Sequence, residues 1–439
     1  MNVALAKTDT GHALDAAFAA ARERLPAVGN VADIRRQALE AYERTGLPHR
    51  RIEDWKYTDL RVLIREVLPL ASTPDTAALK RAESVLKAAA IAGVRRLVLV
   101  DGAFAPKLSD IGGLEKGLSI RSLRDALDDG ALQAQLFSLD NANPMVALNS
   151  AMLTDGVVID VADGAVLSQP LHVVHIAAGA TAASMFTRSL LRLGKNVSVT
   201  LVESYAAAEG TGNYQAHDSL VVAISDNSRL DHVRLVEDAA DAVNISSSAV
   251  TLGAHAHFNT FGLTSGAAVS RYQATIAFAG EGSRAETNGV NLLRGRQHAD
   301  TTLLMDHAVP SCASREVFRA VLDDSAHSVF QGRIIVRPDA QKTDAKMMTR
   351  ALLLSDDAEA DNKPELEIFA DDVTCGHGAT SGALDESLLF YLRARGLPEK
   401  EAQALLIQAF VGEAIESIAN DALRDLAMAA AERWLRARA

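Results

Sequence analysis

The chain has 439 residues, of which 48% are hydrophobic and 23% are charged, and its formal net charge is −12 at pH 7. This length and composition are typical of a globular protein with more than one structural region, and the negative charge, without clustered Lys and Arg, argues against a broad nucleic-acid-binding surface. The two cysteines, Cys312 and Cys375, are too few for a disulfide framework or for a metal site with four thiolate ligands.

The N-terminus carries no recognisable targeting signal. Its first residues, MNVALAKTDTGHALDAAF, contain neither the basic segment nor the continuous apolar segment of a secretory signal. No later segment is apolar and uncharged over the length that a bilayer requires, so we expect no membrane association. Together with the low cysteine content, this predicts a cytoplasmic protein.

Residues 1–94 are predicted to form an N-terminal helical region. Apolar residues recur three and four positions apart over residues 12–25 and again over residues 31–42, which is the spacing of an amphipathic helix. A further helix is predicted over residues 76–91, a stretch rich in Ala, Leu and Lys.

The middle of the chain is predicted to be rich in strands. Residues 95–156 are predicted as an α/β connecting segment, because RRLVLVDG at its start has the pattern of a buried strand. Residues 157–382 contain many short strands separated by turn residues, with no helical period. Such strands can form a sandwich, a barrel or a β-solenoid, and the long uninterrupted run favours a solenoid whose coil length the irregular sequence repeat does not give.

Residues 383–439 are predicted to form a C-terminal bundle of helices. Leu388 and Tyr391 belong to the first predicted helix, and Leu405 and Phe410 belong to the second. A third apolar stripe completes the bundle at the end of the chain.

Cys375 and His377 form the arrangement with the clearest chemical potential. Residues i and i+2 of a strand face the same side, so a thiolate and an imidazole at these positions could bind a soft or borderline metal together. Taken alone, however, such a pair more often packs inertly in the structure.

Other chemical motifs are weaker. His255 and His257 could also share a strand face, but a histidine pair without a nearby carboxylate or thiol more often packs or hydrogen-bonds than binds a metal. We interpret Cys312 as a buried structural cysteine because its neighbours are apolar. No GxxxxGK[ST] loop occurs, so the chain is not expected to bind a nucleotide or to be an ATPase itself.

Longer stretches of the sequence resemble one protein family. Residues 340–396 strongly resemble the shared C-terminal region of SufB and SufD, subunits of the Suf iron–sulfur cluster assembly machinery. The matching elements include Ala340-Gln341, Leu352 to Ser355, Leu366 to Ile368, Asp372-Val373, Cys375, His377-Gly378-Ala379-Thr380 and Gly382. Upstream, NGVNLLRGRQHADTTLL resembles the β-region of the family, and EDWKYT at residues 53–58 resembles its N-terminal E-x-W-K-Y-T segment.

The resemblance implies a fold and two partner proteins. It implies a right-handed parallel β-helix flanked by N-terminal and C-terminal helices. It further implies SufB as a partner joined through the β-helix, and SufC, an ABC-type ATPase, docked on the C-terminal helices, where Leu388, Tyr391, Leu405 and Phe410 are the candidate contacts. Within the family, the few cysteines and the segment Cys-Gly-His-Gly-Ala-Thr are more similar to SufD than to SufB.

The resemblance also implies a site that is shared between chains. It places His377 at the contact with SufB, where we expect this histidine, with Cys375 beside it, to contribute to a transient iron–sulfur cluster or iron site. A flavin is associated with the assembled complex in this family, but no residue of the sequence points to a flavin site.

The sequence therefore predicts a non-catalytic scaffold subunit for iron–sulfur cluster assembly, which could form a homodimer when SufB is absent. Two alternatives from other classes remain at this point. One is a β-solenoid enzyme acting on polysaccharides, against which the low aromatic content and the missing export signal count. The other is a metalloenzyme that uses His255 and His257.

Overall fold

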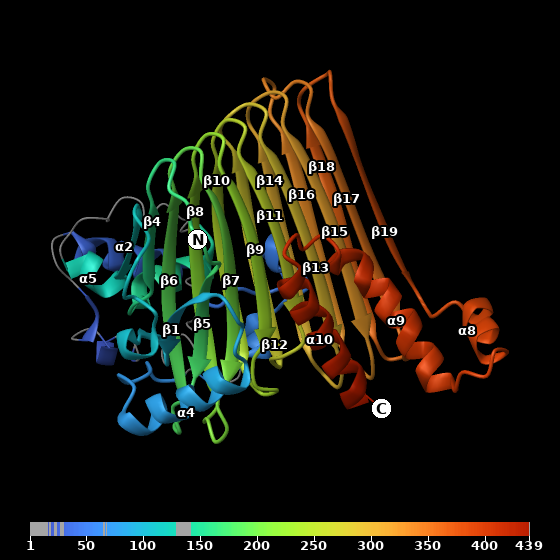
Figure 1. Cartoon of the computed structure of the whole chain (residues 1–439), viewed down its shortest axis with the longest axis horizontal. Helices are drawn as coiled ribbons and strands as arrows, with labels where there is room; N and C mark the ends of the chain where they lie inside the picture. The colour runs from blue at the N-terminus through green and yellow to red at the C-terminus, as the bar shows by residue number, and fades with distance from the viewer. Residues whose placement is uncertain are drawn as a thin grey trace, which may run out of the picture.

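Strands stacked in parallel dominate the chain, and helices lie at both ends of the stack (Figure 1). The computed structural model describes residues 16, 19–21, 24–26, 30–64, 66, 68–128 and 142–438. The helix expected over residues 12–25 lies mostly outside these residues. The predicted fold, a β-helix core between helical regions, is confirmed, and the solenoid has about eight turns.

Two sheets form the solenoid, and successive strands join them alternately, so that each coil contributes one strand to each sheet. The first sheet contains β4 (Val157–Val161), β6 (Ala183–Leu193), β8 (Tyr214–Ile224), β10 (Val243–Leu252), β12 (Val269–Phe278), β14 (His298–His307), β16 (His327–Val336) and β18 (Glu359–Ile368). The second contains β5 (Leu171–Ala177), β7 (Ser198–Ala207), β9 (Arg229–Glu237), β11 (His257–Thr264), β13 (Arg284–Leu293), β15 (Ala313–Leu322), β17 (Asp344–Leu353) and β19 (Thr374–Gly382).

The coils differ in length, which explains the irregular sequence repeat. Paired residues are 26 positions apart in the shortest coil (243 and 269) and 32 positions apart in the longest (327 and 359). One corner of each coil contains a residue with positive φ, where glycine and asparagine are favoured. These corner residues are Gly164, Asn196, Asn227, His255, Gly282, Ser311 and Lys342.

Alternate residues of each strand point into the solenoid, where equivalent positions of neighbouring coils stack on one another. One such file runs through Val199, Leu230, Phe258 and Ala285, all of them buried in the central apolar core. The opposite face of each sheet is covered by helices or faces solvent. Each file of the core therefore contains one side chain from every coil that it crosses.

The N-terminal region covers the first coils of both sheets. The helices predicted over residues 31–42 and 76–91 are present as α2 (Val31–Thr45) and α4 (Thr76–Ala88). Two strands of this region extend the solenoid: β1 (Arg95–Val100) pairs in parallel with β5, and β3 (Leu118–Ser122) pairs antiparallel with β4. The remaining short elements are η2 (Glu53–Trp55), α3 (Leu60–Leu63), β2 (Ala103–Phe104), η3 (Pro106–Leu108), α5 (Leu123–Asp128) and α7 (Pro144–Met152).

The EDWKYT segment anchors the N-terminal region on the outer face of the first sheet. Trp55 is buried, and the guanidinium of Arg271 on β12 lies 3.8 Å from the centre of its ring. Arg271 forms a buried ion pair with Asp300 on β14, which also accepts a hydrogen bond from Thr58. Removing either charge would leave the other buried without its oppositely charged partner, which typically costs about 3–5 kcal/mol.

The three predicted C-terminal helices are present as α8 (Glu386–Arg393), α9 (Glu399–Ile415) and α10 (Asp421–Arg438). Helices α9 and α10 lie across the outer face of the second sheet (Figure 1), where Ile407 and Val411 pack against Val290 and Val321. In contrast, α8 extends beyond the last strand and has no buried residue. Within the described part of the chain, no helix is long and apolar enough to cross a membrane.

Candidate functional site

The solenoid ends in two strands that are open on one side. Strands β18 and β19 are terminal in their sheets and pair only with β16 and β17 among the described strands. None of the residues in either strand is buried, unlike those of the preceding coils. Figure 1 shows both strands at the end of the stack, next to α8. The backbone groups along this outer edge can therefore pair with another chain.

Cys375 and His377 lie on the same face of β19. Their register partners on β17 are Ala345 and Met347, which belong to the core inside the solenoid. Both residues therefore face the interior side of the last coil. Cys375 is half-buried against that core, whereas His377 is exposed.

The Cys375 thiol is not activated within the chain alone. Burial raises its pKa, the backbone N–H of Ala345 opposes this shift, and the charges of Asp344 and Glu316 add to it. Because the thiolate is the form that binds metals, a cation from elsewhere would have to displace the proton. Among the described residues, no third His, Cys, Asp or Glu lies close enough to form a three-ligand group with the Cys375 and His377 pair.

A file of side chains leads from His377 back into the solenoid. It occupies one register position in six consecutive coils of the second sheet: His232, Thr260, Thr287, Glu316, Met347 and His377. At its inner end, His232 Nδ1 lies 2.9 Å from Thr260 Oγ1 and His232 Nε2 lies 2.9 Å from Glu203 Oε2. A cavity of about 40 Å³ adjoins Thr260 and Thr287.

Glu316 is the unusual member of this file. It is buried, and neither of its carboxyl oxygens has a hydrogen-bond partner. Burial raises the pKa of Glu316 to about 8, against smaller opposing effects of Ser314 and Arg315. The side chain is therefore predominantly a neutral acid at pH 7, and it lies two coils from His377.

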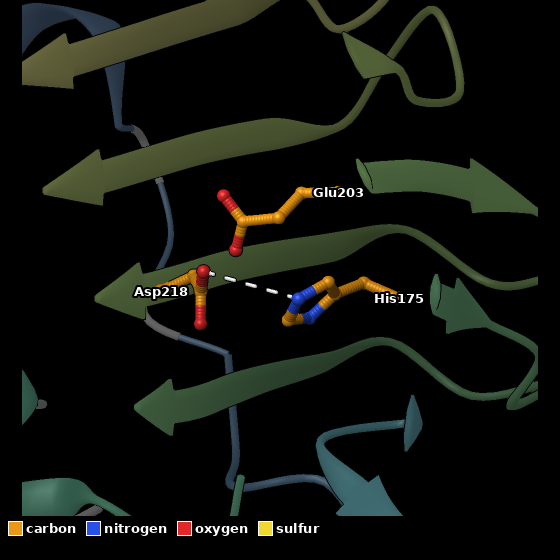
Figure 2. Close-up of side chains that lie close together, drawn as sticks. All are labelled: His175, Glu203 and Asp218. Carbon is orange, nitrogen blue, oxygen red and sulfur yellow. Dashed lines mark ion pairs between the residues drawn. The ribbon is translucent and has the colours of Figure 1, made fainter. Parts of the chain in front are cut away.

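A second polar group occupies the interior of the first coils. His175 on β5, Glu203 on β7 and Asp218 on β8 each present one potential ligand atom, and these atoms lie within 4.8 Å of one another. Figure 2 shows the three side chains converging from different strands. Tyr205 stacks on His175 with ring centres 4.5 Å apart and donates a hydrogen bond of 2.7 Å to Asp218.

Sequence reasoning missed this group because its members come from strands of different coils. The three residues are far apart in the sequence, and only the alignment of neighbouring coils brings their side chains together. The available signal was a charged residue at an inward position of an otherwise apolar strand, as with Glu203 in VSVTLVESY and Asp218 in YQAHDSLVV.

A third group lies on the first sheet at the open end. His327 lies 2.9 Å from Asp361 and 3.2 Å from His298, while Glu359 completes the set. His298 in turn lies 2.9 Å from Thr58, so the polar chain continues to the N-terminal anchor. Because these histidines already have hydrogen-bond partners, we assign this group to holding the EDWKYT segment.

The remaining predicted residues are widely separated. His255 is a corner residue with a φ of 53°, so it does not share a strand face with His257, and this prediction was wrong. The reason is that the coil needs a left-handed residue at that position. Cys312 is buried, as predicted.

The candidate contact residues of the C-terminal helices divide into two groups. Leu388, Tyr391 and Leu405 are exposed by 51%, 51% and 46%, whereas Phe410 packs against the second sheet next to Arg319. Six of the nine exposed large hydrophobic residues in the described part of the chain lie between residues 368 and 405: Ile368, Phe369, Leu388, Phe390, Tyr391 and Leu405. Such a concentration is typical of a protein-binding surface.

Comparisons with known proteins give consistent matches. The family described as "SUF system FeS cluster assembly, SufBD core domain" matches residues 175–410, and "SufBD protein N-terminal region" matches residues 16–173. An iron–sulfur cluster assembly SufBD family protein of Synechocystis sp. is 31% identical over 385 residues, which cover 85% of this chain and 84% of that protein. The iron–sulfur cluster assembly protein SufD of Escherichia coli is 30% identical over 397 residues, which cover 90% of each chain.

The buried carboxyl group of Glu316 predicts a distinctive pH dependence of stability. In the unfolded chain it would lose its proton near pH 4.3, but in the folded chain it keeps the proton up to about pH 8. The folded state then binds the extra proton between these values, so stability falls as pH rises through this window, by on the order of a few kcal/mol in total. We expect Glu316→Gln to remove most of this loss in thermal unfolding at pH 5 and pH 8.5.

The matched control is Glu209→Gln, because Glu209 is exposed in a turn. This variant should keep the pH dependence of the unmodified protein. An identical difference between pH 5 and pH 8.5 in Glu316→Gln and in the unmodified protein would contradict the assignment of a neutral buried acid.

Proposed function

The chain belongs to the SufBD family of iron–sulfur cluster assembly proteins, and from this premise we propose that it is a SufD-like scaffold subunit that pairs with SufB and SufC. In this proposal the chain is non-catalytic, works in the cytoplasm and completes a cluster-building site on its partner. The observation that carries the proposal is the open end of the solenoid, where Cys375 and His377 form an incomplete set of ligands.

The free edges of β18 and β19 support pairing with SufB through the β-helix. Thr374 donates its backbone N–H to the carbonyl oxygen of Thr343, the residue before β17, and alternate residues of a strand direct their backbone groups to the same side. The backbone groups of Cys375, His377 and Ala379 therefore point to the outer edge, where a strand of SufB can continue the sheet. Without SufB, a second copy of this chain could occupy the same edge.

The composition of the open end supports a site shared with SufB. Iron–sulfur clusters are held mainly by thiolates, and this end offers the single cysteine Cys375, with His377 two residues away. Neutral imidazole suits iron as a ligand. In the proposal, His377 binds the iron of the transient cluster, Cys375 assists it, and SufB supplies the remaining thiolates.

The exposed apolar side chains of α8 and α9 support docking of SufC. Leu388, Phe390 and Tyr391 cover the surface of a helix that has no buried residue, so they can be buried against a partner at little structural cost. The sequence contains no phosphate-binding loop, so ATP hydrolysis falls to SufC. The alternative enzyme functions receive no support from the family, and His255 and His257 do not form a ligand pair.

Ala379 allows the pairing edge to be tested without disturbing the fold. Ala379→Pro removes one outward backbone N–H and places a ring at the edge, so we expect the affinity for SufB to fall by about tenfold or more. Ala379→Val, which keeps the N–H, is the matched control. Calorimetry with purified SufB measures both variants, and equal affinity for the two would contradict pairing through this edge.

His377→Ala tests the shared site separately from pairing. We expect the iron and sulfide content of the reconstituted complex to fall several-fold while the complex still forms, because an exposed side chain is lost and the backbone edge remains. His257→Ala, at an exposed histidine of β11, is the control. Chemical iron and sulfide analysis after size-exclusion chromatography checks the result, and an unchanged cluster content would remove His377 from the site.

Leu388→Asp tests the docking of SufC. A charge in the centre of the apolar surface of α8 is expected to weaken binding by about tenfold or more, because it would be desolvated in the contact. Ala422→Asp introduces the same charge at an exposed position of α10 and should bind SufC normally. Surface plasmon resonance with immobilised SufC compares them, and full affinity of Leu388→Asp would show that SufC docks elsewhere.

A further inference from the structure

The polar group inside the first coils has two atoms that the protein leaves without partners. Asp218 is well satisfied, because Tyr205 and Thr187 both donate hydrogen bonds to it. Glu203 is only partly satisfied. Its Oε2 lies 2.9 Å from His232 Nε2, but its Oε1 has no hydrogen-bond partner. The Nε2 atom of His175 has no hydrogen bond either, and lies 3.9 Å from Asp218 Oδ2.

These unpartnered atoms are buried, and they belong to a group whose potential ligand atoms lie within 4.8 Å of one another. The side chain of Glu203 is 2% exposed and that of His175 is 12% exposed. Figure 2 shows one carboxylate oxygen of Glu203 turned toward the His175 and Asp218 pair. A buried polar oxygen without a hydrogen-bond partner costs about 1–3 kcal/mol, so a group in this position calls for an explanation.

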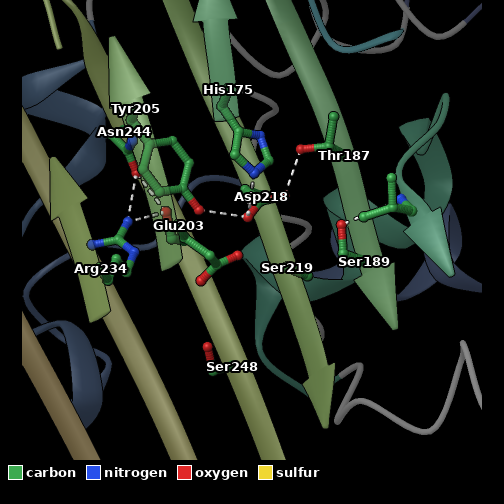
Figure 3. Close-up of polar contacts among 12 residues, drawn as sticks. His175, Thr187, Ser189, Glu203, Tyr205, Asp218, Ser219, Arg234, Asn244 and Ser248 are labelled. Atoms are coloured by element: carbon green, nitrogen blue, oxygen red, sulfur yellow. Dashed lines mark hydrogen bonds and ion pairs between the residues drawn. The ribbon is translucent and has the colours of Figure 1, made fainter. Parts of the chain in front are cut away.

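The cations nearby do not neutralise the group. Arg234 lies between the rings of Tyr205 and Tyr272, 4.7 Å from each. It donates hydrogen bonds to Ser246 and Asn244 instead. Figure 3 shows Arg234 beside Tyr205 and Asn244. Within the described part of the chain, Arg234 forms no ion pair with Glu203 or Asp218 at 4.0 Å or less. The direct contact of Glu203 is the ring of His232, through the single oxygen Oε2.

The potential ligand atoms of this group are oxygen and nitrogen only. Two carboxylates and one imidazole nitrogen converge here from three strands, while the two cysteines lie in other coils, at residues 312 and 375.

We propose that His175, Glu203 and Asp218 bind one divalent transition-metal ion inside the first coils of the solenoid. One imidazole and two carboxylates form a donor set suited to borderline cations such as Fe²⁺ or Zn²⁺, whereas Cu⁺ prefers thiolates. Metal–ligand bonds of about 2.1 Å would bring the ligand atoms to about 3.3 Å from one another, a contraction that small rotations of three side chains supply. The ion would neutralise both carboxylates.

This proposal goes beyond the proposed function and does not depend on SufB or SufC. The site lies at the opposite end of the solenoid from Cys375 and His377, and it is enclosed by packed strands. An ion must therefore enter while the coils fold, and its binding free energy becomes folding free energy. The metal would clamp β5, β7 and β8 together at the first coils.

The test uses the full chain produced in medium supplemented with iron or zinc, followed by desalting and elemental analysis. We expect about one metal ion per chain, bound through nitrogen and oxygen only in X-ray absorption spectra. Glu203→Gln keeps an acceptor for His232 but loses the charge, so its metal content should fall about tenfold or more. His175→Phe keeps the stacking on Tyr205 and should lose the metal as well.

Two controls separate this site from the open end. His257→Ala and the double variant Cys375→Ala/His377→Ala should both keep the interior metal. Circular dichroism verifies folding, and if Glu203→Gln does not fold, His175→Phe decides the outcome. A metal-free chain after refolding with excess Fe²⁺ or Zn²⁺, or full metal content in the folded variants, would overturn the proposal.

Discussion

The in-register parallel stacking of the coils governs the rest of this structure. Each inward side chain lies on the equivalent side chain of the next coil, so an inward polar group must find its partner in a neighbouring coil or stay unsatisfied. The interior is apolar in most files, as with Val199, Leu230 and Phe258. The exceptions, the His232 file and the group around Asp218, are polar over several consecutive coils, because one buried polar group requires another beside it.

Much of the fold was predictable from the sequence, and the part that was not has a clear cause. Strands and helices follow from local patterns of apolar and turn residues. The predicted ranges of α2, α4, the core strands and the C-terminal helices therefore lie close to the observed bounds. The register between coils is a long-range property, and coil lengths of 26 to 32 residues hide it. His175, Glu203 and Asp218 therefore could not be grouped from the sequence. The prediction that His255 shares a strand face with His257 was wrong for a local reason. His255 has the backbone conformation of a corner residue and lies outside the strand.

The two ends of the solenoid differ in what they leave incomplete. At the open end, Cys375 and His377 are accessible and the backbone edge is free, which is the arrangement expected where a second chain completes both the sheet and the ligand set. At the closed end, the proposed ligands come from one chain, and Glu203 and Asp218 are buried while His175 is nearly so. The first arrangement suits cargo that must be built and released, and the second suits an ion that stays with the protein.

The corner residues have a consequence for how such a chain can change during evolution. The pairing of the strands determines which inward side chains stack on one another, and the coils differ in length at their corners. An insertion or deletion at a corner such as Asn196 or Ser311 therefore leaves this stacking unchanged. A single residue inserted within a strand would instead move each following side chain of that strand to the opposite face, turning inward polar groups outward. Length variation among homologous chains should therefore collect at the corners, and the strands should keep a constant length while their sequences drift.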